Sequence, residues 1–129
     1  MLAADTNVWA RALLEDDKTQ AAKAKEALTR ARSASGIFVP LLVLAELSWV
    51  LRSRWDREKV LDTLDGMLRT RGVLVESPAL ARKAVDAARN GAAGFADHLI
   101  AEISFAASAN EILTFDKAFA RQPRVRRLH

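Results

Sequence analysis

Ile37–Leu51 reads IFVPLLVLAELSWVL, and this stretch is the clearest guide to the fold. Its first three residues are β-branched or aromatic, which is typical of a short buried strand. Pro40 suits the first turn of a helix, so a helix is predicted from there to about Arg54. With fifteen residues that include Glu46, the stretch is too short and too polar to cross a bilayer, which takes roughly 20 apolar residues. A strand that leads directly into an apolar helix indicates a mixed α/β core.

The same alternation continues on both sides of this stretch, because short apolar runs are separated by helical patterns and by Gly, Pro or Asp. Strands that alternate with helices predict an α/β fold with a parallel sheet of four to five strands, in one domain over residues 1–129. The strands are expected at Leu2–Ala4, Ile37–Val39, Val73–Val75 and Glu111–Phe115, with Val125–Leu128 as a fifth strand or a tail. The helices are expected at Val8–Leu14, at Lys18–Arg32, from Pro40 to about Arg54, from a cap at Asp56 to Gly72, from Pro78 to Asn90, and at Phe95–Ala107.

Composition excludes several classes of protein and of site. Half of the residues are apolar and 28% are charged, which argues against a disordered chain. The absence of cysteine excludes disulfides, thiolate zinc sites and cysteine nucleophiles, and two histidines are too few for a histidine-rich metal site. A net charge of +4 is compatible with a polyanionic partner. The N-terminus has no secretory pattern, so a cytoplasmic protein without a membrane partner is expected.

Two acids directly follow predicted strands. Asp5 comes after the first strand and Asp116 after the fourth. Ligands of open α/β sheets bind beyond the carboxyl ends of the strands, so the two carboxylates would meet if these strands are neighbours. The alternative is that each Asp only caps a helix, a role in which Asp is favoured.

Two further acids border apolar helical surfaces. Glu46 is the only charge in Ile37–Leu51, and a buried, unpaired carboxylate would cost several kcal/mol. It is either aimed at a cation or lies on a solvated stripe with Ser48. Asp97 lies in the first turn of its helix, where the helix dipole alone would favour an acid. Four converging carboxylates would repel one another, so a bound Mg²⁺, Mn²⁺ or Ca²⁺ is expected if they meet.

At these positions the sequence resembles the PIN-domain ribonucleases, and specifically the VapC-type toxins of VapBC toxin–antitoxin systems. The resemblance covers nearly the whole chain. The matching segments are Asp5-Thr6-Asn7, Ala45-Glu46-Leu47, Phe95-Ala96-Asp97-His98-Leu99-Ile100 and Thr114-Phe115-Asp116.

The resemblance implies a three-layer α/β/α sandwich in which Asp5 and Asp116 follow adjacent strands of a central parallel sheet. It implies that Asp5, Glu46, Asp97 and Asp116 hold Mg²⁺ or Mn²⁺, with Thr6, Asn7 and Thr114 in support. The implied activity is hydrolysis of RNA phosphodiester bonds, and the implied partners are a VapB-type antitoxin and a second copy of the chain. The RNA is open among tRNA, rRNA and mRNA. A non-catalytic RNA- or antitoxin-binding module and an RNA-processing nuclease remain alternatives.

Basic residues give a weaker indication of an RNA surface. The C-terminal segment carries Arg121, Arg124, Arg126 and Arg127, which either follow phosphates or protect a solvated edge strand.

A second basic cluster, formed by Arg52, Arg54 and Arg57, lies next to Trp49 and Trp55 in the sequence. The apolar face of Trp49 and Val50 with the helix around Val60–Leu68 is a candidate groove for an antitoxin helix.

Overall fold

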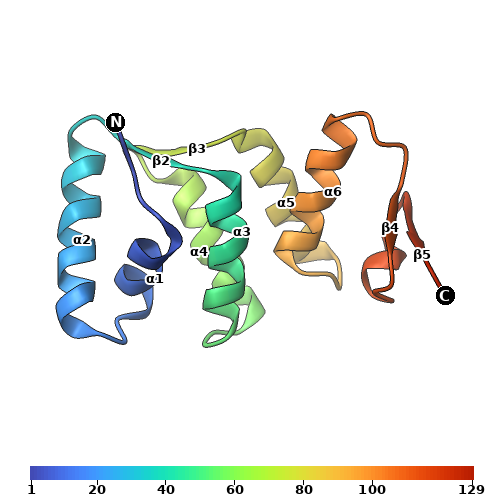
Figure 1. Cartoon of the computed structure of the whole chain (residues 1–129), viewed down its shortest axis with the longest axis horizontal. Coiled ribbons are helices and arrows are strands. Elements are labelled where there is room, and N and C mark those ends of the chain that lie inside the picture. Colours follow the sequence, from blue (N-terminus) through green and yellow to red (C-terminus); the bar gives the residue numbers. More distant parts are fainter.

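The computed structural model describes residues 1–129, the whole chain. Figure 1 shows a three-stranded sheet and the first five helices in one body, with α6 beside α5 and a two-stranded ribbon at the far end. The α-helices are α1 (Thr6–Leu14), α2 (Lys18–Ser33), α3 (Leu41–Arg52), α4 (Arg57–Arg69), α5 (Pro78–Asn90) and α6 (Phe95–Ala106). The strands are β1 (Leu2–Ala3), β2 (Ile37–Val39), β3 (Val73–Val75), β4 (Ile112–Thr114) and β5 (Val125–Arg127), and a 3-10 turn η1 spans Phe119–Arg121.

Aspartate caps begin three of the helices. The side chains of Asp5, Asp17 and Asp56 accept hydrogen bonds from the backbone N–H of the third residue of α1, α2 and α4, respectively. Each such cap stabilises a helix by about 1 kcal/mol relative to Ala. The predicted cap at Asp56 and the predicted Pro start of α5 are confirmed.

All strand pairs are parallel, as the sequence predicts. In the first sheet the order is β1-β2-β3, and in the second β4 pairs with β5. Gly72 has a φ of +87° and approaches the carbonyl oxygen of Arg32 so closely that a Cβ atom would lie 2.5 Å from it. Glycine is therefore required where the chain enters β3. The α/β class and the existence of a fifth strand are confirmed.

The strands do not form one central sheet of four to five strands. The structure has a sheet of three and a sheet of two, and β4 does not pair with β1. The prediction that the first and fourth strands are neighbours in one sheet is therefore wrong. Hydrophobic pattern predicts that a strand exists but not which strand it joins, and β1 has only two residues with which to hold a partner.

Two apolar cores correspond to this division. The larger core lies between the three-stranded sheet and helices α1 to α6, and its fully buried members include Leu44, Leu47, Leu51 and Leu64. A small second core joins α6 to the β4–β5 ribbon through Ala101, Phe119 and other residues. No helix is both long and apolar enough to cross a membrane.

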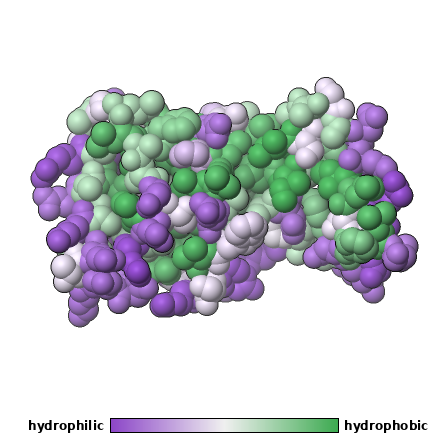
Figure 2. All heavy atoms as spheres, viewed as in Figure 1, coloured by the Kyte–Doolittle hydropathy of each residue, from purple (hydrophilic) through white to green (hydrophobic).

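Several apolar side chains stay on the surface. Figure 2 shows that they gather on the face formed by α3, α6 and the β4–β5 ribbon. They include Leu42, Trp49, Ile100, Ile103, Leu113 and Phe115, and Trp49 is 64% exposed.

The charged contact between α4 and α5 gives a pH-dependent prediction. Arg82 forms a hydrogen bond and ion pair with Asp65, and this bond chiefly lowers the pKa of the carboxyl group, while partial burial opposes it. We expect Asp65→Asn to lower the free energy of unfolding at neutral pH by about 1 kcal/mol, because both side chains are partly exposed. Asp86→Asn, which removes a more exposed partner of Arg82, should change it by less than about 0.5 kcal/mol.

The sign of the pH dependence follows from the lowered pKa. The contribution of Asp65 is complete above its ordinary pKa of 3.8 and is lost as the pH falls through the lower, folded value. The difference between wild type and Asp65→Asn should therefore shrink in acid, as urea unfolding between neutral pH and about pH 3 would measure. A difference that does not change with pH would contradict this assignment.

Candidate active site

Asp5 and Glu46 are brought together by one hydroxyl group. Asp5 ends the β1 segment and caps α1, with its Oδ1 accepting from Val8 N at 3.2 Å. The next residue, Thr6, donates its hydroxyl to Glu46 Oε1 on α3 at 2.8 Å. This bond spans forty positions of sequence and fixes the start of α1 against the middle of α3. The structure therefore places the two acids at the same edge of the molecule.

Glu46 is exposed, so it avoids the cost of a buried, unpaired carboxylate. Leu44 and Leu47 point into the core while Glu46 faces outward. Its proposed neighbour on a solvated stripe, Ser48, is buried and donates its hydroxyl to the Ala45 carbonyl. The bond from Thr6, and not burial, therefore defines the position of Glu46.

Asp97 lies in the first turn of α6, as predicted, and is half-buried. It lines a small cleft of about 100 Å³ between α6 and the C-terminal half of α3, with Ser48, Trp49 and Arg52 among the other lining residues. Because α6 packs on α3, Asp97 and Glu46 belong to adjoining helices.

Asp116 directly follows β4 in the β4–β5 ribbon, which does not pair with the sheet that contains β1 (Figure 1). Its backbone N–H donates to Thr114 Oγ1 at 3.0 Å, and its Oδ1 accepts from Phe119 N at 2.8 Å. Thr114 thus orders the turn that carries Asp116, and Asp116 caps η1. No three acidic or histidine side chains are close enough together to hold a metal ion. The single chain therefore does not bring the expected quartet together.

The donor chemistry of the Asp5–Glu46 pair fits a hard divalent cation. Each carboxylate uses one oxygen within the protein, Asp5 Oδ1 and Glu46 Oε1, and the other oxygen of each accepts no hydrogen bond from the chain. Mg²⁺ commonly binds one or two carboxylates and retains several waters. Asp5 and Glu46 could thus hold such an ion, with Asn7 exposed beside them at the next helical position.

Most of the arginines considered for RNA contact make bonds within the chain. Arg124 donates to the carbonyls of Ala109 and Asn110 and lies over the Phe105 ring. Arg126 pairs with Glu111, a bond that lowers the carboxyl pKa of Glu111.

Of the four C-terminal arginines, Arg121 and Arg127 are exposed and form no ion pair. In the other cluster, Arg52 donates to the Trp55 carbonyl and Arg54 pairs with Asp16. Both clusters therefore contribute fewer free charges than their sequence suggests.

Arg57 has a structural role that sequence analysis did not find. Its guanidinium enters the loop after α5 and donates to the carbonyls of Ala88, Gly91, Ala92 and Ala93. That loop leads directly into the helix that carries Asp97. No local pattern marks this role, because the four acceptors lie more than thirty positions away in the sequence.

The expected antitoxin groove is only partly free. The apolar stripe of α4, including Val60, Leu61 and Leu64, is buried in the core, and only Val60 and Leu61 reach the surface, in the small cleft that Asp97 lines. Trp49 instead borders an apolar groove of about 300 Å³ that also includes Leu42, Ile100 and Ile103, between α3 and α6.

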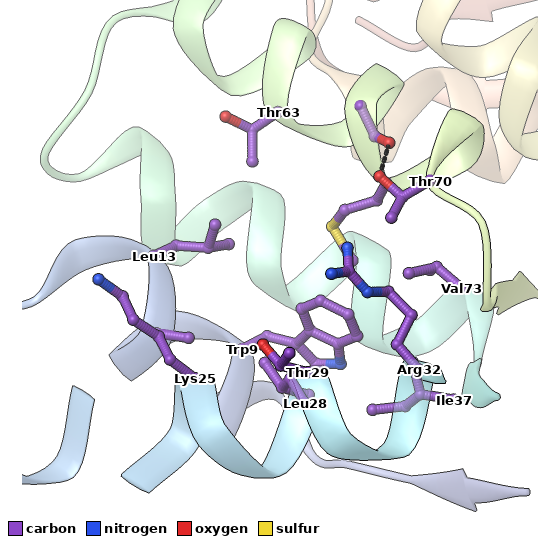
Figure 3. Close-up of a pocket in the computed structure, with 13 residues that line it drawn as sticks. Trp9, Leu13, Lys25, Leu28, Thr29, Arg32, Ile37, Thr63, Thr70 and Val73 are labelled. Carbon is purple, nitrogen blue, oxygen red and sulfur yellow. Dashed lines mark hydrogen bonds between the residues drawn. The ribbon is translucent and has the colours of Figure 1, made fainter. Parts of the chain in front are cut away.

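Two buried polar groups have no partner, and neither belongs to the acids. His98 Nε2 and Trp9 Nε1 make no hydrogen bond. Burial, with a smaller effect from the Arg57 charge, lowers the pKa of His98, which agrees with a structural role for this buried residue of α6. Trp9 lines a cavity of about 370 Å³ bounded by α1, α2 and α4, with Leu28 and Arg32 at its wall (Figure 3). None of the four acids lines this cavity.

The family model described as PIN domain matches residues 3–125 of the chain. The match includes all four acids and β4, the strand that Asp116 follows. No curated protein matches the chain.

Proposed function

The chain belongs to the PIN-domain family, and from this premise we propose that it is an endoribonuclease that depends on Mg²⁺ or Mn²⁺. PIN domains are generally nucleases, they usually bind divalent metals, and they act on nucleic acids. The observation that supports the proposal is the Thr6 bridge, which holds two exposed carboxylates at one edge of the fold. We propose RNA as the substrate and water as the nucleophile.

In this proposal, some residues bind the cation and another positions the residues that bind it. Asp5 and Glu46 would hold the cation through their unbonded oxygens, and Thr6 keeps the Glu46 carboxylate turned toward Asp5. A divalent cation supplies charge that polarises a phosphodiester and lowers the pKa of the attacking water. Asp97, on the neighbouring helix, would accept a proton or orient water at the same edge.

The exposure of the pair favours a polymeric substrate. Asp5 and Glu46 both lie at the surface, and neither lines one of the larger cavities. A small-molecule enzyme normally encloses its substrate in a concave, mostly apolar pocket. An open carboxylate edge instead admits a continuous nucleic-acid backbone, and Arg121 and Arg127 are free to meet its phosphates.

The proposed biological role of the nuclease is that of a VapC-type toxin. The apolar face of α3 and α6 gives the chain a surface that a protein partner would cover, consistent with an inhibitory VapB-type antitoxin or a second copy. An RNA-processing nuclease would use the same acids, so an antitoxin is what distinguishes the two roles.

A non-catalytic binding module is the second candidate, favoured by one observation. The strand before Asp116 does not pair with β1, and the chain groups no three potential metal ligands. A module of this kind would retain RNA without metal-dependent products.

The deciding experiment incubates the purified, antitoxin-free chain with total bacterial RNA in Mg²⁺, in Mn²⁺ or in EDTA. We expect discrete RNA fragments with either metal and none in EDTA, because the pair needs a cation to act. The Glu46→Gln variant, which keeps an acceptor for Thr6 but loses the charge, should yield no fragments. Retention of intact RNA by folded protein in both metals would favour the binding module.

The Thr6 bridge can be tested separately. Thr6→Val keeps the shape of the side chain but removes the donor to Glu46, so we expect metal affinity and cleavage rate to fall by about 10–100-fold. Titration with Mn²⁺ and initial cleavage rates would measure both effects. Thr63→Val removes a hydroxyl that bonds only within α4, and it should leave both values unchanged. Equal values for Thr6→Val and wild type would show that the bridge does not position the pair.

A further inference from the structure

A groove of about 500 Å³ runs between α1 and α2 and includes the helical turn that Asp5 caps. Val8, whose backbone N–H donates to Asp5 Oδ1, lines this groove together with the exposed Asn7. The other lining residues are Arg11 on α1 and Gln20, Lys23, Ala24 and Ala27 on α2. The groove is therefore joined to the same edge of the molecule as the Asp5–Glu46 pair.

Two cations and no acid line the α1–α2 groove. Lys23 is exposed and forms no ion pair, whereas Lys25 and Arg30 of the same helix are paired with glutamates. Arg11 bonds both carboxylate oxygens of Asp16 through Nη1 alone, so its other two guanidinium nitrogens have no partner in the chain. Lys23 thus supplies the free positive charge of the groove, and Arg11 adds free donors, which together suit phosphate groups.

The uncharged lining residues suit a nucleotide strand as well. Asn7 and Gln20 are exposed and present one amide group from each helix. An amide both donates and accepts, so it can bind the edges of unpaired bases and the ribose hydroxyl. Ala24 and Ala27 are small, which leaves room for a strand to approach the backbone of α2 closely.

We propose that the RNA strand on one side of the scissile phosphate lies in the α1–α2 groove, with Lys23 as a contact to its backbone phosphates. A phosphate held at the Asp5–Glu46 pair is next to the turn where Asn7 and Val8 line the groove, so the strand can continue directly into it. Lys23 then holds the substrate and takes no part in the chemical step. Because the strand is the substrate of the proposed nuclease, this assignment rests on the proposed function.

The cavity beside Trp9 does not offer the same path. None of the four acids lines it, and neither does Asn7 or Val8. More than half of its lining residues are apolar, and its Lys25 is already paired with Glu15. The α1–α2 groove therefore differs from this cavity both in its free charge and in its continuity with the acids.

The phosphate contact can be measured by the fluorescence anisotropy of a labelled single-stranded RNA in EDTA, where no cleavage is expected. At about 0.1 M salt, Lys23→Ala should weaken binding about fivefold and reduce the slope of log K against log salt by about 0.7, the value for one phosphate contact on a single strand. Lys23→Arg keeps the charge and should restore both values. Lys83→Ala is the matched control, because Lys83 is also exposed and unpaired but lies on α5, outside the groove.

A steric block tests the path independently of charge, because the chain has no cysteine of its own. Ala27→Cys in the groove is labelled with a bulky maleimide, and Ala22→Cys, which is also exposed on α2 but outside the groove, is labelled as its control. The Ala27 adduct should weaken RNA binding at least about fivefold, since it keeps the strand away from Lys23. The Ala22 adduct should bind RNA as the unlabelled chain does.

The two binding measurements can fail separately from the proposed function. A loss of affinity in Lys23→Ala no larger than in Lys83→Ala, or unchanged binding by the Ala27 adduct, would overturn the path, and so would a folded wild-type chain that does not bind RNA. A chain that binds RNA through Lys23 but does not cut it in Mg²⁺ or Mn²⁺ would refute the nuclease alone. Where RNA is cut, Lys23→Ala should raise KM about fivefold and leave kcat unchanged. A fall in kcat at unchanged KM would overturn the assignment of Lys23 to substrate binding.

Discussion

The Asp5→Asn variant should cleave RNA at least about 100-fold more slowly than wild type, because loss of a ligand should exceed the effect of losing a supporting residue. Its melting temperature should stay within roughly 2 °C, since Asn caps a helix about as well as Asp and can still accept from Val8 N. Initial cleavage rates in Mg²⁺ and thermal unfolding would measure the two effects. A large loss of activity with unchanged stability separates a cation-binding role from a capping role.

Asp17 provides the matched control for this substitution. It caps α2 as Asp5 caps α1, with its Oδ1 accepting from Gln20 N at 3.0 Å, but it has no link to Glu46. Asp17→Asn should therefore leave cleavage unchanged. If Asp5→Asn also cleaves at the wild-type rate, Asp5 is only a helix cap.

The local elements could be predicted because the signals for them are local. The three helices capped by Asp are each marked by an Asp before a helical pattern, and the β-branched runs mark the strands. The positions of Asp5 at the end of β1 and of Asp97 in the first turn of α6 follow from those same patterns. The chain thus specifies these elements over short distances.

Strand partners and long-range bonds could not be read in the same way. The apolar pattern of β4 predicts a strand that is covered on both faces, but it identifies neither what covers those faces nor which strand pairs with β4. The bond from Thr6 to Glu46 joins residues forty positions apart, and its geometry depends on how α1 packs on α3. These features arise from tertiary packing, which the residue pattern constrains only weakly.

The position of Asp116 depends both on the local residue pattern and on tertiary packing. The sequence places an acid after β4, and the ribbon presents that acid at an unpaired, apolar edge. The residues of β4 predict a strand that is buried on both faces, but in the fold of one chain the face that carries Leu113 is exposed. The local pattern and the tertiary structure therefore disagree at β4.

Arg57→Ala should be the most destabilising of the substitutions considered, lowering the free energy of unfolding by about 3 kcal/mol. The guanidinium donates to carbonyls at the end of α5 and in the following loop, and its positive charge also suits a helix C-terminus. Removing it leaves part-buried acceptors without donors. Urea unfolding measures the loss of stability, and cleavage should fall as well because the same loop positions α6 and Asp97.

Two neighbouring substitutions show whether the forked geometry of Arg57 matters. Arg57→Lys keeps the charge but cannot reach several carbonyls at once, so it should recover less than half of the loss. Arg54→Ala removes an arginine of the same cluster that pairs only with the partly exposed Asp16, and it should cost less than about 1 kcal/mol. If Arg57→Ala were no more destabilising than Arg54→Ala, the loop before α6 would have to be held by its own backbone. Asp97 would then owe its position to the packing of α6 on α3 and α5 alone.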